Sequence, residues 1–300
     1  MPAASAHPCH CGLGPNEALR LTDGRATLLH TLGDFMSAVA LVFSVLVGPA
    51  HAQEAPPVVL GTPTRDYPAV GAFVAEDEGY GAVFCSGTVI EDQWVLTAGH
   101  CQVAAELYAD EGYDIYFVVG TDVGTSAGVR DYERVDRTVL HPDYEDAPYL
   151  LNDVGLAHLE GALDGIEPIE LNREDPATNS WTGDTLKYVG WGITGDGEVD
   201  AGTKRYADIA IEAIDSYFIY GYDTGGRNLC SGDSGGAALV VGDDGVTRIA
   251  GVNSFVYVTD SVTPRCEGGG NGAARVDQYL QWIGQYAKDS GGGSGGEGGT

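Results

Sequence analysis

Short β-type runs separated by turn residues constrain the fold of this chain more than any other feature. They follow one another from Val58 to about Trp282, with Gly, Asp, Asn and Pro between them. Regularly spaced strands with little helical periodicity are typical of an all-β sandwich or of paired barrels. We therefore predict an all-β fold. The clearest runs are residues 82–90, 114–120, 185–192, 236–242 and 249–258.

One segment near the end has a different period. Apolar side chains recur at helical spacing within residues 276–286, at Val276, Tyr279, Leu280 and Ile283. We predict a C-terminal amphipathic helix docked on the body. The length of 300 residues does not require a second domain, because all-β domains commonly exceed about 200 residues.

The N-terminal region carries an export signal. The apolar run at residues 38–47 is too short to span a bilayer, which takes about 20 residues. Ala50-His51-Ala52 follows it, an A-x-A pattern that predicts a signal peptide cleaved after Ala52. Residues 1–52 are then a signal peptide, over-extended if Met36 is the true start. The alternative is a buried helix of a small N-terminal domain.

Gly and Ser dominate the last residues, 289–300, which are too poor in apolar side chains to pack. Such a composition behaves as a flexible coil. The tail either leads to a C-terminal surface anchor or is a plain spacer. We expect a secreted or periplasmic protein whose folded domain spans residues 58–288, preceded by a possible propeptide at residues 53–57.

The charge balance excludes some partners. Lys and Arg number 15 against 44 Asp and Glu, a net charge of −29. This field repels phosphate backbones, so we expect no nucleic-acid partner. We also expect no membrane span, a monomer, and no metal or organic cofactor. A Ca²⁺ site would be one use of the acidic residues, but no Asp-x-Asp-x-Asp-Gly loop occurs.

The cysteines agree with export. The region after the signal contains Cys85, Cys101, Cys230 and Cys266. An even number of cysteines in an exported chain predicts two disulfides. Spacing alone allows three pairings among four cysteines.

Three short segments carry candidate chemistry. They are TAGHC at 97–101, NDVGLA at 152–157 and GDSGG at 232–236. Serine acyl transfer needs a base within hydrogen-bond reach of the hydroxyl and a third group that fixes the tautomer of that base. His100, Asp153 and Ser234 are the candidates. The flanking glycines allow the N–H groups of Gly232 and Ser234 to converge as an oxyanion hole.

With these motifs in this order, the chain resembles the chymotrypsin/trypsin family of serine proteases from Val58 to about Tyr286. Weaker matches support the resemblance: Tyr67-Pro68, CSGTVI (85–90), LHPDY (140–144), VGWG (189–192) and YLQWI (279–283). The resemblance implies two six-stranded antiparallel β-barrels with a C-terminal helix. It also implies that His100 is the general base, that Asp153 orients it, and that Ser234 is the nucleophile.

The resemblance further implies the disulfides and the substrate pocket. Cys85 would pair with Cys101 and Cys230 with Cys266. Trypsin-like members have Asp at the position of Asn228, so the pocket should prefer an uncharged residue. The predicted substrate-binding residues are Asn228, Ser254, Phe255, Val256 and Gly272, with Ser254 behind Asp153 and Val256 narrowing the entrance.

Activation is the last implied property. In the family a new α-ammonium pairs with the Asp before the nucleophile, which here would join Val58 to Asp233. Pro56-Pro57 precede Val58, and trypsin-like enzymes do not cut after Pro. Either residues 53–57 are therefore a propeptide removed by another protease, or the enzyme works without this switch. We hypothesise the former, a zymogen.

The sequence therefore predicts a secreted serine endopeptidase acting on protein or peptide substrates. Two other functions remain open. One is a non-catalytic binding relative, although such proteins usually lose a triad residue. The other is an esterase with the same triad.

Overall fold

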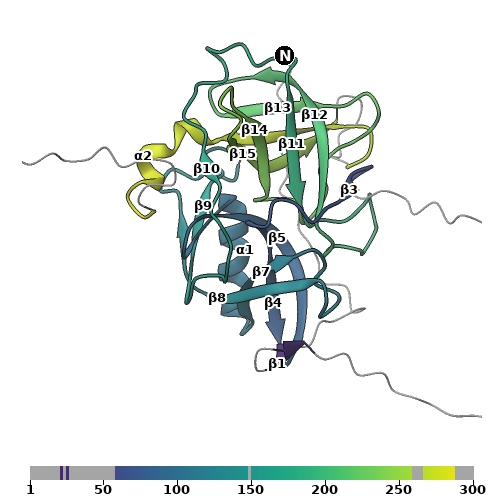
Figure 1. The fold of residues 1–300 in the computed structure, drawn as a ribbon, viewed down its shortest axis with the longest axis vertical. Coiled ribbons are helices and arrows are strands. Elements are labelled where there is room, and N and C mark those ends of the chain that lie inside the picture. The colour runs from purple at the N-terminus through teal and green to yellow at the C-terminus, as the bar shows by residue number, and fades with distance from the viewer. Residues whose placement is uncertain (1–20, 23–24, 27–57, 148–149, 259–265, 288–300) are drawn as a thin grey trace, which may run out of the picture.

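The protein is described here as a computed structural model covering residues 21–22, 25–26, 58–147, 150–258 and 266–287 (Figure 1). Apart from residues 21–22 and 25–26, the predicted signal peptide (1–52) lies outside these residues, as do the possible propeptide at 53–57 and the tail at 289–300. In the N-terminal region, β1 (Leu21–Thr22) and β2 (Arg25–Ala26) form one short antiparallel ladder.

The first of two bodies is a closed antiparallel barrel of six strands, in the order β4-β5-β6-β9-β8-β7. Large side chains such as Phe73 and Phe117 fill its interior, with ring centroids 5.1 Å apart. The strands are β4 (Val70–Asp77), β5 (Tyr80–Glu91), β6 (Trp94–Thr97), β7 (Asp114–Gly120), β8 (Val129–Leu140) and β9 (Gly155–Leu159).

The second body is closed in the same way. Its order is β15-β14-β11-β12-β13-β16, and pairing of β15 with β16 completes the circuit. Two short strands join from outside: β10 (Glu170–Leu171) beside β15, and β3 (Thr62–Pro63) beside β12. The barrel strands are β11 (Thr185–Gly190), β12 (Arg205–Ile214), β13 (Phe218–Tyr222), β14 (Ala237–Val241), β15 (Thr247–Tyr257) and β16 (Gly270–Arg275).

The all-β, two-barrel prediction is thus confirmed. The five apolar runs identified in the sequence correspond to β5, β7, β11, β14 and β15. Each run alternates or is wholly apolar because barrel strands face a packed interior on at least one side.

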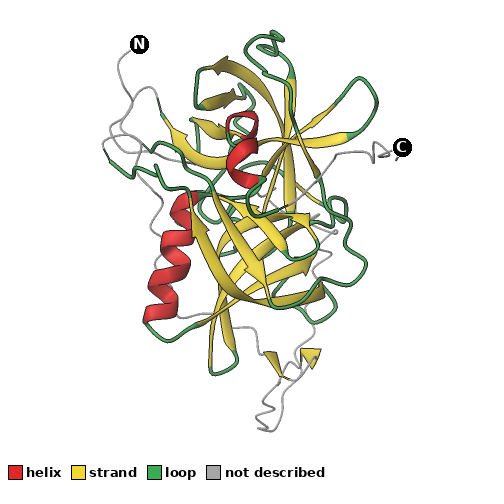
Figure 2. Cartoon of the chain, turned by 90° about the vertical axis from the view of Figure 1, so that its left-hand side faces the viewer, coloured by secondary structure: helices red, strands yellow, loops and turns green. Residues whose placement is uncertain are grey.

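The helices differ from expectation. The sequence analysis did not predict α1 (Gly99–Asp110), which starts directly after β6 and lies along the first barrel (Figure 2). The predicted terminal helix is short: a 3₁₀ turn, η1 (Val276–Gln278), precedes α2 (Leu280–Ile283). Tyr279, at φ −110° and ψ 4°, interrupts the α-helical path between them. No helix in the described ranges is long and apolar enough to cross a membrane.

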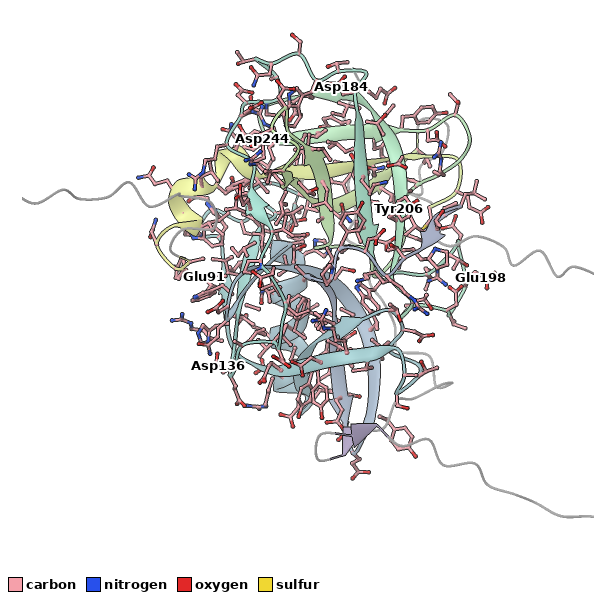
Figure 3. All side chains as sticks on the ribbon, in the orientation of Figure 1. Glu91, Asp136, Asp184, Glu198, Tyr206 and Asp244 are labelled. Atoms are coloured by element: carbon pink, nitrogen blue, oxygen red, sulfur yellow. A yellow bond between two sulfur atoms is a disulfide. The ribbon has the colours of Figure 1, made fainter. Side chains whose placement is uncertain are left out.

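Acidic side chains are distributed over both barrels. Asp136 lies on the first barrel, whereas Asp184, Glu198 and Asp244 belong to the second (Figure 3). Both barrels therefore contribute to the negative charge.

Candidate active site

A buried carboxylate and an imidazole form the centre of the site. Nδ1 of His100 lies 2.9 Å from Oδ2 of Asp153 and 3.1 Å from Oδ1. The backbone N–H of His100 also donates to Oδ1, at 2.8 Å. His100 is the second residue of α1, so Asp153 accepts one of the free N–H groups of the helix N-terminus and lies at its positive end.

The second barrel contributes a further donor to this carboxylate. Asp153 is completely buried, and Oγ of Ser254 donates to its Oδ2 at 2.5 Å. Ser254 belongs to β15, while Asp153 precedes β9. Three donors thus compensate the carboxylate for its loss of water.

Two opposing effects set the basicity of His100. Burial disfavours the imidazolium and acts to lower the pKa, while the charge of Asp153 and its hydrogen bond act to raise it. The pKa of His100 ends above its ordinary value of 6.5. A histidine held in one tautomer with raised basicity is suited to act as a general base.

The loop that carries Ser234 lies against the first barrel. The backbone oxygen of Ser234 accepts from the N–H of Ser86 at 2.7 Å and lies 3.5 Å from Sγ of Cys101, the residue after His100. Within the described residues, Oγ of Ser234 makes no hydrogen bond to His100. Catalytic hydrogen bonds are often long without substrate, so this arrangement does not argue against a triad.

Two backbone donors beside Ser234 are free. The N–H groups of Gly232 and Ser234 have no acceptor among the described residues, whereas Asp233, Gly235 and Gly236 all donate to backbone oxygens. Gly232 has φ +94°, and an added Cβ would lie 2.9 Å from Cα of Gly192. Only glycine fits this left-handed turn, which exposes the two N–H groups for an external oxygen.

Ser86 is a site residue that sequence reasoning missed. Its fully buried Oγ donates to the oxygen of Gly232 at 2.7 Å and accepts from the N–H of Trp191 at 3.0 Å. Ser86 therefore links the first barrel to the loop that exposes the free donors. Its place beside Cys85 in the sequence was the only signal, and it did not identify the partner.

Both disulfides have the pairing that the resemblance implied. Cys85–Cys101 has a Cα separation of 6.1 Å and joins β5 to α1, the helix that carries His100. Cys230–Cys266 has a Cα separation of 4.9 Å and ties the loop before Ser234 to the segment before β16. Each closes a loop that chain-entropy arguments value at about 3–4 kcal/mol.

A small pocket opens beside Ser234. Its free volume is about 10 Å³, about the space of one water molecule, so the pocket is narrow in this structure. Three predicted residues, Ser254, Phe255 and Val256, line it together with Ser234. Asn228 and Gly272 do not belong to the lining.

Asn228 is fully buried and engaged with backbone. Its Nδ2 donates to the oxygens of Cys266 and Gly270, at 2.9 and 3.3 Å, and its Oδ1 accepts from Nδ2 of Asn271 at 3.1 Å. A neutral amide pair therefore occupies this position, consistent with the absence of a carboxylate for Lys or Arg.

Gly272, predicted to bind substrate, packs against Phe255. A bulge in β15 places Phe255 opposite Gly272 and Val256 opposite Asn271. An added Cβ on Gly272 would lie 2.3 Å from the Phe255 ring, so this glycine accommodates the aromatic side chain. Asn271, which was not predicted, faces Asn228 instead.

The two residues predicted for activation are both buried. Asp233 accepts from the N–H groups of Gly192 and Cys230, at 2.8 and 2.9 Å, and burial raises its pKa to about 6. Val58 lies in the core of the second barrel, and the oxygen of Val59 accepts from the N–H of Asn228 at 3.2 Å. No hydrogen bond or ion pair joins Val58 to Asp233 within the described part of the chain.

Comparison with known proteins agrees with this geometry. The family model described as Trypsin matches residues 60–283. The chain belongs to the trypsin family of serine proteases. Residues His100, Asp153 and Ser234 all lie inside the matched range.

Individual relatives of the trypsin family are moderately similar. The chain is 32% identical to Trypsin of Saccharopolyspora erythraea over 189 residues, which is 59% of this chain and 78% of that protein. It is 28% identical to Trypsin-1 of Astacus astacus over 196 residues, 60% and 79% of the two chains. It is 30% identical to Serine protease SP24D of Anopheles gambiae over 215 residues, 67% and 71%.

Proposed function

We propose that this member of the trypsin family is a secreted serine endopeptidase that works through an acyl-enzyme intermediate. The observation that carries the proposal is the 2.9 Å contact between Nδ1 of His100 and the buried Asp153 carboxylate. This contact holds the imidazole with Nε2 unengaged, beside a serine loop with two free N–H groups.

In the proposed reaction, Oγ of Ser234 attacks the carbonyl carbon of the scissile bond while Nε2 of His100 takes the hydroxyl proton. The negative oxygen of the tetrahedral intermediate accepts from the N–H groups of Gly232 and Ser234. The imidazolium then gives its proton to the leaving amine, and Asp153 stabilises that cation. Water repeats the sequence on the acyl group, which regenerates Ser234.

The proposed substrates carry a small or medium uncharged residue at the primary specificity site. Val256 and Phe255 line a pocket whose free volume is only about 10 Å³, and Asn228 supplies no negative charge. Pocket size and missing charge together disfavour Lys and Arg.

The proposal includes export and activation by cleavage before Val58. Two disulfides are typical of an oxidising compartment. Asp233 is a buried carboxylate without a cationic partner at hydrogen-bond distance among the described residues, and a new α-ammonium at Val58 would supply one. Mass spectrometry of the active secreted protein should find Val58 as the first residue, and a start at Gln53 contradicts this part of the proposal.

A labelling experiment tests the catalytic proposal. A sulfonyl fluoride or organophosphorus reagent should modify Ser234 and no other serine, as peptide mass spectrometry will show. Ser234→Ala should abolish labelling and casein turnover, whereas Ser216→Ala, a change on an exposed turn, should leave both unchanged. Absence of labelling favours a binding relative, and labelling with ester but no casein hydrolysis favours an esterase.

A further inference from the structure

An open pocket of about 250 Å³, called the cavity below, lies away from the catalytic residues and is lined by segments of both barrels. The N-terminal segment after β3 forms one side of it, the connection between β7 and β8 another, and the residue before β12 the third. Backbone hydrogen bonds fix this junction: the N–H of Lys204 donates to Thr121 at 2.9 Å, and the N–H of Thr64 donates to Lys204 at 3.0 Å.

The charge of the lining is opposite to that of the protein. Arg65, Arg130 and Lys204 all line the cavity, and no carboxylate does. Among the described residues, none of the three forms an ion pair. Five other cations, by contrast, are each paired with a carboxylate: Arg134, Lys187, Arg227, Arg248 and Arg275.

Lys204 is the most unusual member of this cluster. It is only 1% exposed, and Nζ has a single acceptor, the oxygen of Tyr67 at 3.1 Å. An ammonium carries three donors, so a buried one with one acceptor is poorly satisfied. Nη2 of Arg130 donates hydrogen bonds to the backbone oxygens of Gly165 and Asp164. The other N–H groups of this guanidinium have no acceptor in the described part of the chain.

We propose that this cavity is a binding site for a small multivalent oxyanion of the phosphate or sulfate type. Guanidinium forks and an ammonium are the groups that recognise such anions. A free volume of about 250 Å³ is many times the roughly 10–15 Å³ that one water needs by the same measure, enough for the anion and some of its hydration. The net charge of −29 repels extended polyanions, which selects a small free anion.

Binding would connect both barrels to the N-terminal segment, so the expected effect is on stability. A ligand that binds only the folded protein stabilises it by RT ln(1 + L/Kd), where L is the free ligand concentration, so the melting temperature rises with the logarithm of that concentration above Kd. Sodium sulfate and sodium phosphate should raise Tm more in the wild type than in variants without the cavity cations, a comparison that removes the general stabilising effect of these salts. Calorimetric titration should give a saturable sulfate site.

Matched variants make the test specific to this cavity. Lys204→Met and the double change Arg65→Gln with Arg130→Gln should each weaken sulfate binding by about tenfold or more. Arg137→Gln is the control, because Arg137 lies on the same strand as Arg130 but over the ring of Trp94. The double variant changes exposed side chains only, so it tests the proposal even if Lys204→Met does not fold.

The pH profile gives an independent readout. Burial lowers the pKa of Lys204 to about 8, with Asp66 acting to raise it and Arg130 to lower it. Sulfate keeps its charge, so its affinity should fall between pH 7 and 9 in the wild type, and this fall should be absent in Lys204→Met. Equal Tm in sulfate and chloride, or wild-type affinity in the double variant, would overturn the proposal.

Discussion

Oγ of Ser254 on the second barrel donates a hydrogen bond of 2.5 Å to Oδ2 of Asp153 on the first. The same oxygen accepts from Nδ1 of His100, at 2.9 Å. Asp153 is thus held by donors from both barrels, and the orientation of His100 depends on how the barrels are docked. A change in Ser254 should therefore reach the base through the carboxylate.

Ser254→Ala should lower kcat/KM by about tenfold, because a hydrogen bond to a charged group contributes about 1.5–3 kcal/mol and part of it is felt in the transition state. The acid limb of the pH–rate profile should move to higher pH, since the Asp153 charge is then shared with one donor fewer. Initial rates between pH 5 and 9 measure both. An unchanged profile would show that Ser254 does not act through Asp153.

The raised pKa of His100 predicts the pH at which activity is lost on the acidic side of the profile. The base must be neutral, so activity should rise with pH around a midpoint above 6.5. Asp153→Asn should lower kcat by about 10⁴-fold and shift the limb to lower pH, because burial is then no longer offset by the carboxylate.

A second carboxylate–histidine contact in the protein provides a control for this experiment. Nδ1 of His158 lies 2.7 Å from Oδ1 of Asp136, at a more exposed position. Asp136→Asn removes the same kind of interaction elsewhere and should leave kcat and its pH dependence unchanged. If both variants lose activity equally, the effect of Asp153→Asn is on folding.

Local sequence signals predicted an all-β fold and the three catalytic candidates, and the family resemblance implied the two six-stranded barrels. The apolar pattern of a run such as 114–120 indicates burial of one or both strand faces, and this pattern can be seen in consecutive residues. His100, Asp153 and Ser234 stand in short motifs whose residues act on each other. These features can be predicted without knowing which residues far apart in the sequence are in contact.

Features that depend on distant contacts were not predictable. Ser86 acts through Gly232, which is 146 residues away in the sequence. Gly272 pairs with Phe255 and does not line the pocket because a bulge between Asn253 and Phe255 shifts the strand register, and a one-residue shift turns each side chain to the other face. The helix beginning at Gly99 was not predicted, because its first residues belong to the TAGHC motif, which was interpreted only as catalytic.

The pocket geometry gives a prediction about substrate size. Val256→Gly should raise kcat/KM for peptides with Phe or Tyr at the primary site by about tenfold or more relative to Ala, because it removes apolar volume from the lining. A peptide library read by mass spectrometry measures the ratio. A preference that stays constant would place the size limit elsewhere in the pocket.

Asn228→Asp should not create cleavage after Lys or Arg. The Nδ2 group of Asn228 donates to the oxygens of Cys266 and Gly270, so an Asp would direct a carboxylate oxygen at two carbonyls. We expect a lower Tm and no gain in Arg-substrate hydrolysis, measured on the same library. Efficient cleavage after Arg in this variant would show that the side chain is free to turn toward substrate.

Burial of Asp233 gives the last prediction, which concerns stability and activation. In the chain with residues still attached before Val58, the Asp233 pKa is raised from 3.8 to about 6, so the folded state binds more protons than the unfolded state in this interval. Its contribution to the free energy of unfolding must then fall as pH rises from about 4 to 6, by about 3 kcal/mol. An α-ammonium at Val58 would lower the pKa of Asp233 and remove this loss.

The processed form should therefore gain stability over the unprocessed form as pH rises from 4.5 to 7. Urea unfolding of both forms, with disulfides intact and Ser234→Ala to prevent self-cleavage, measures the difference. Asp233→Asn in both forms should make the difference independent of pH, since the titrating group is gone. Parallel pH dependences of the two wild-type forms would mean that the new terminus does not approach Asp233, and activation would need another explanation.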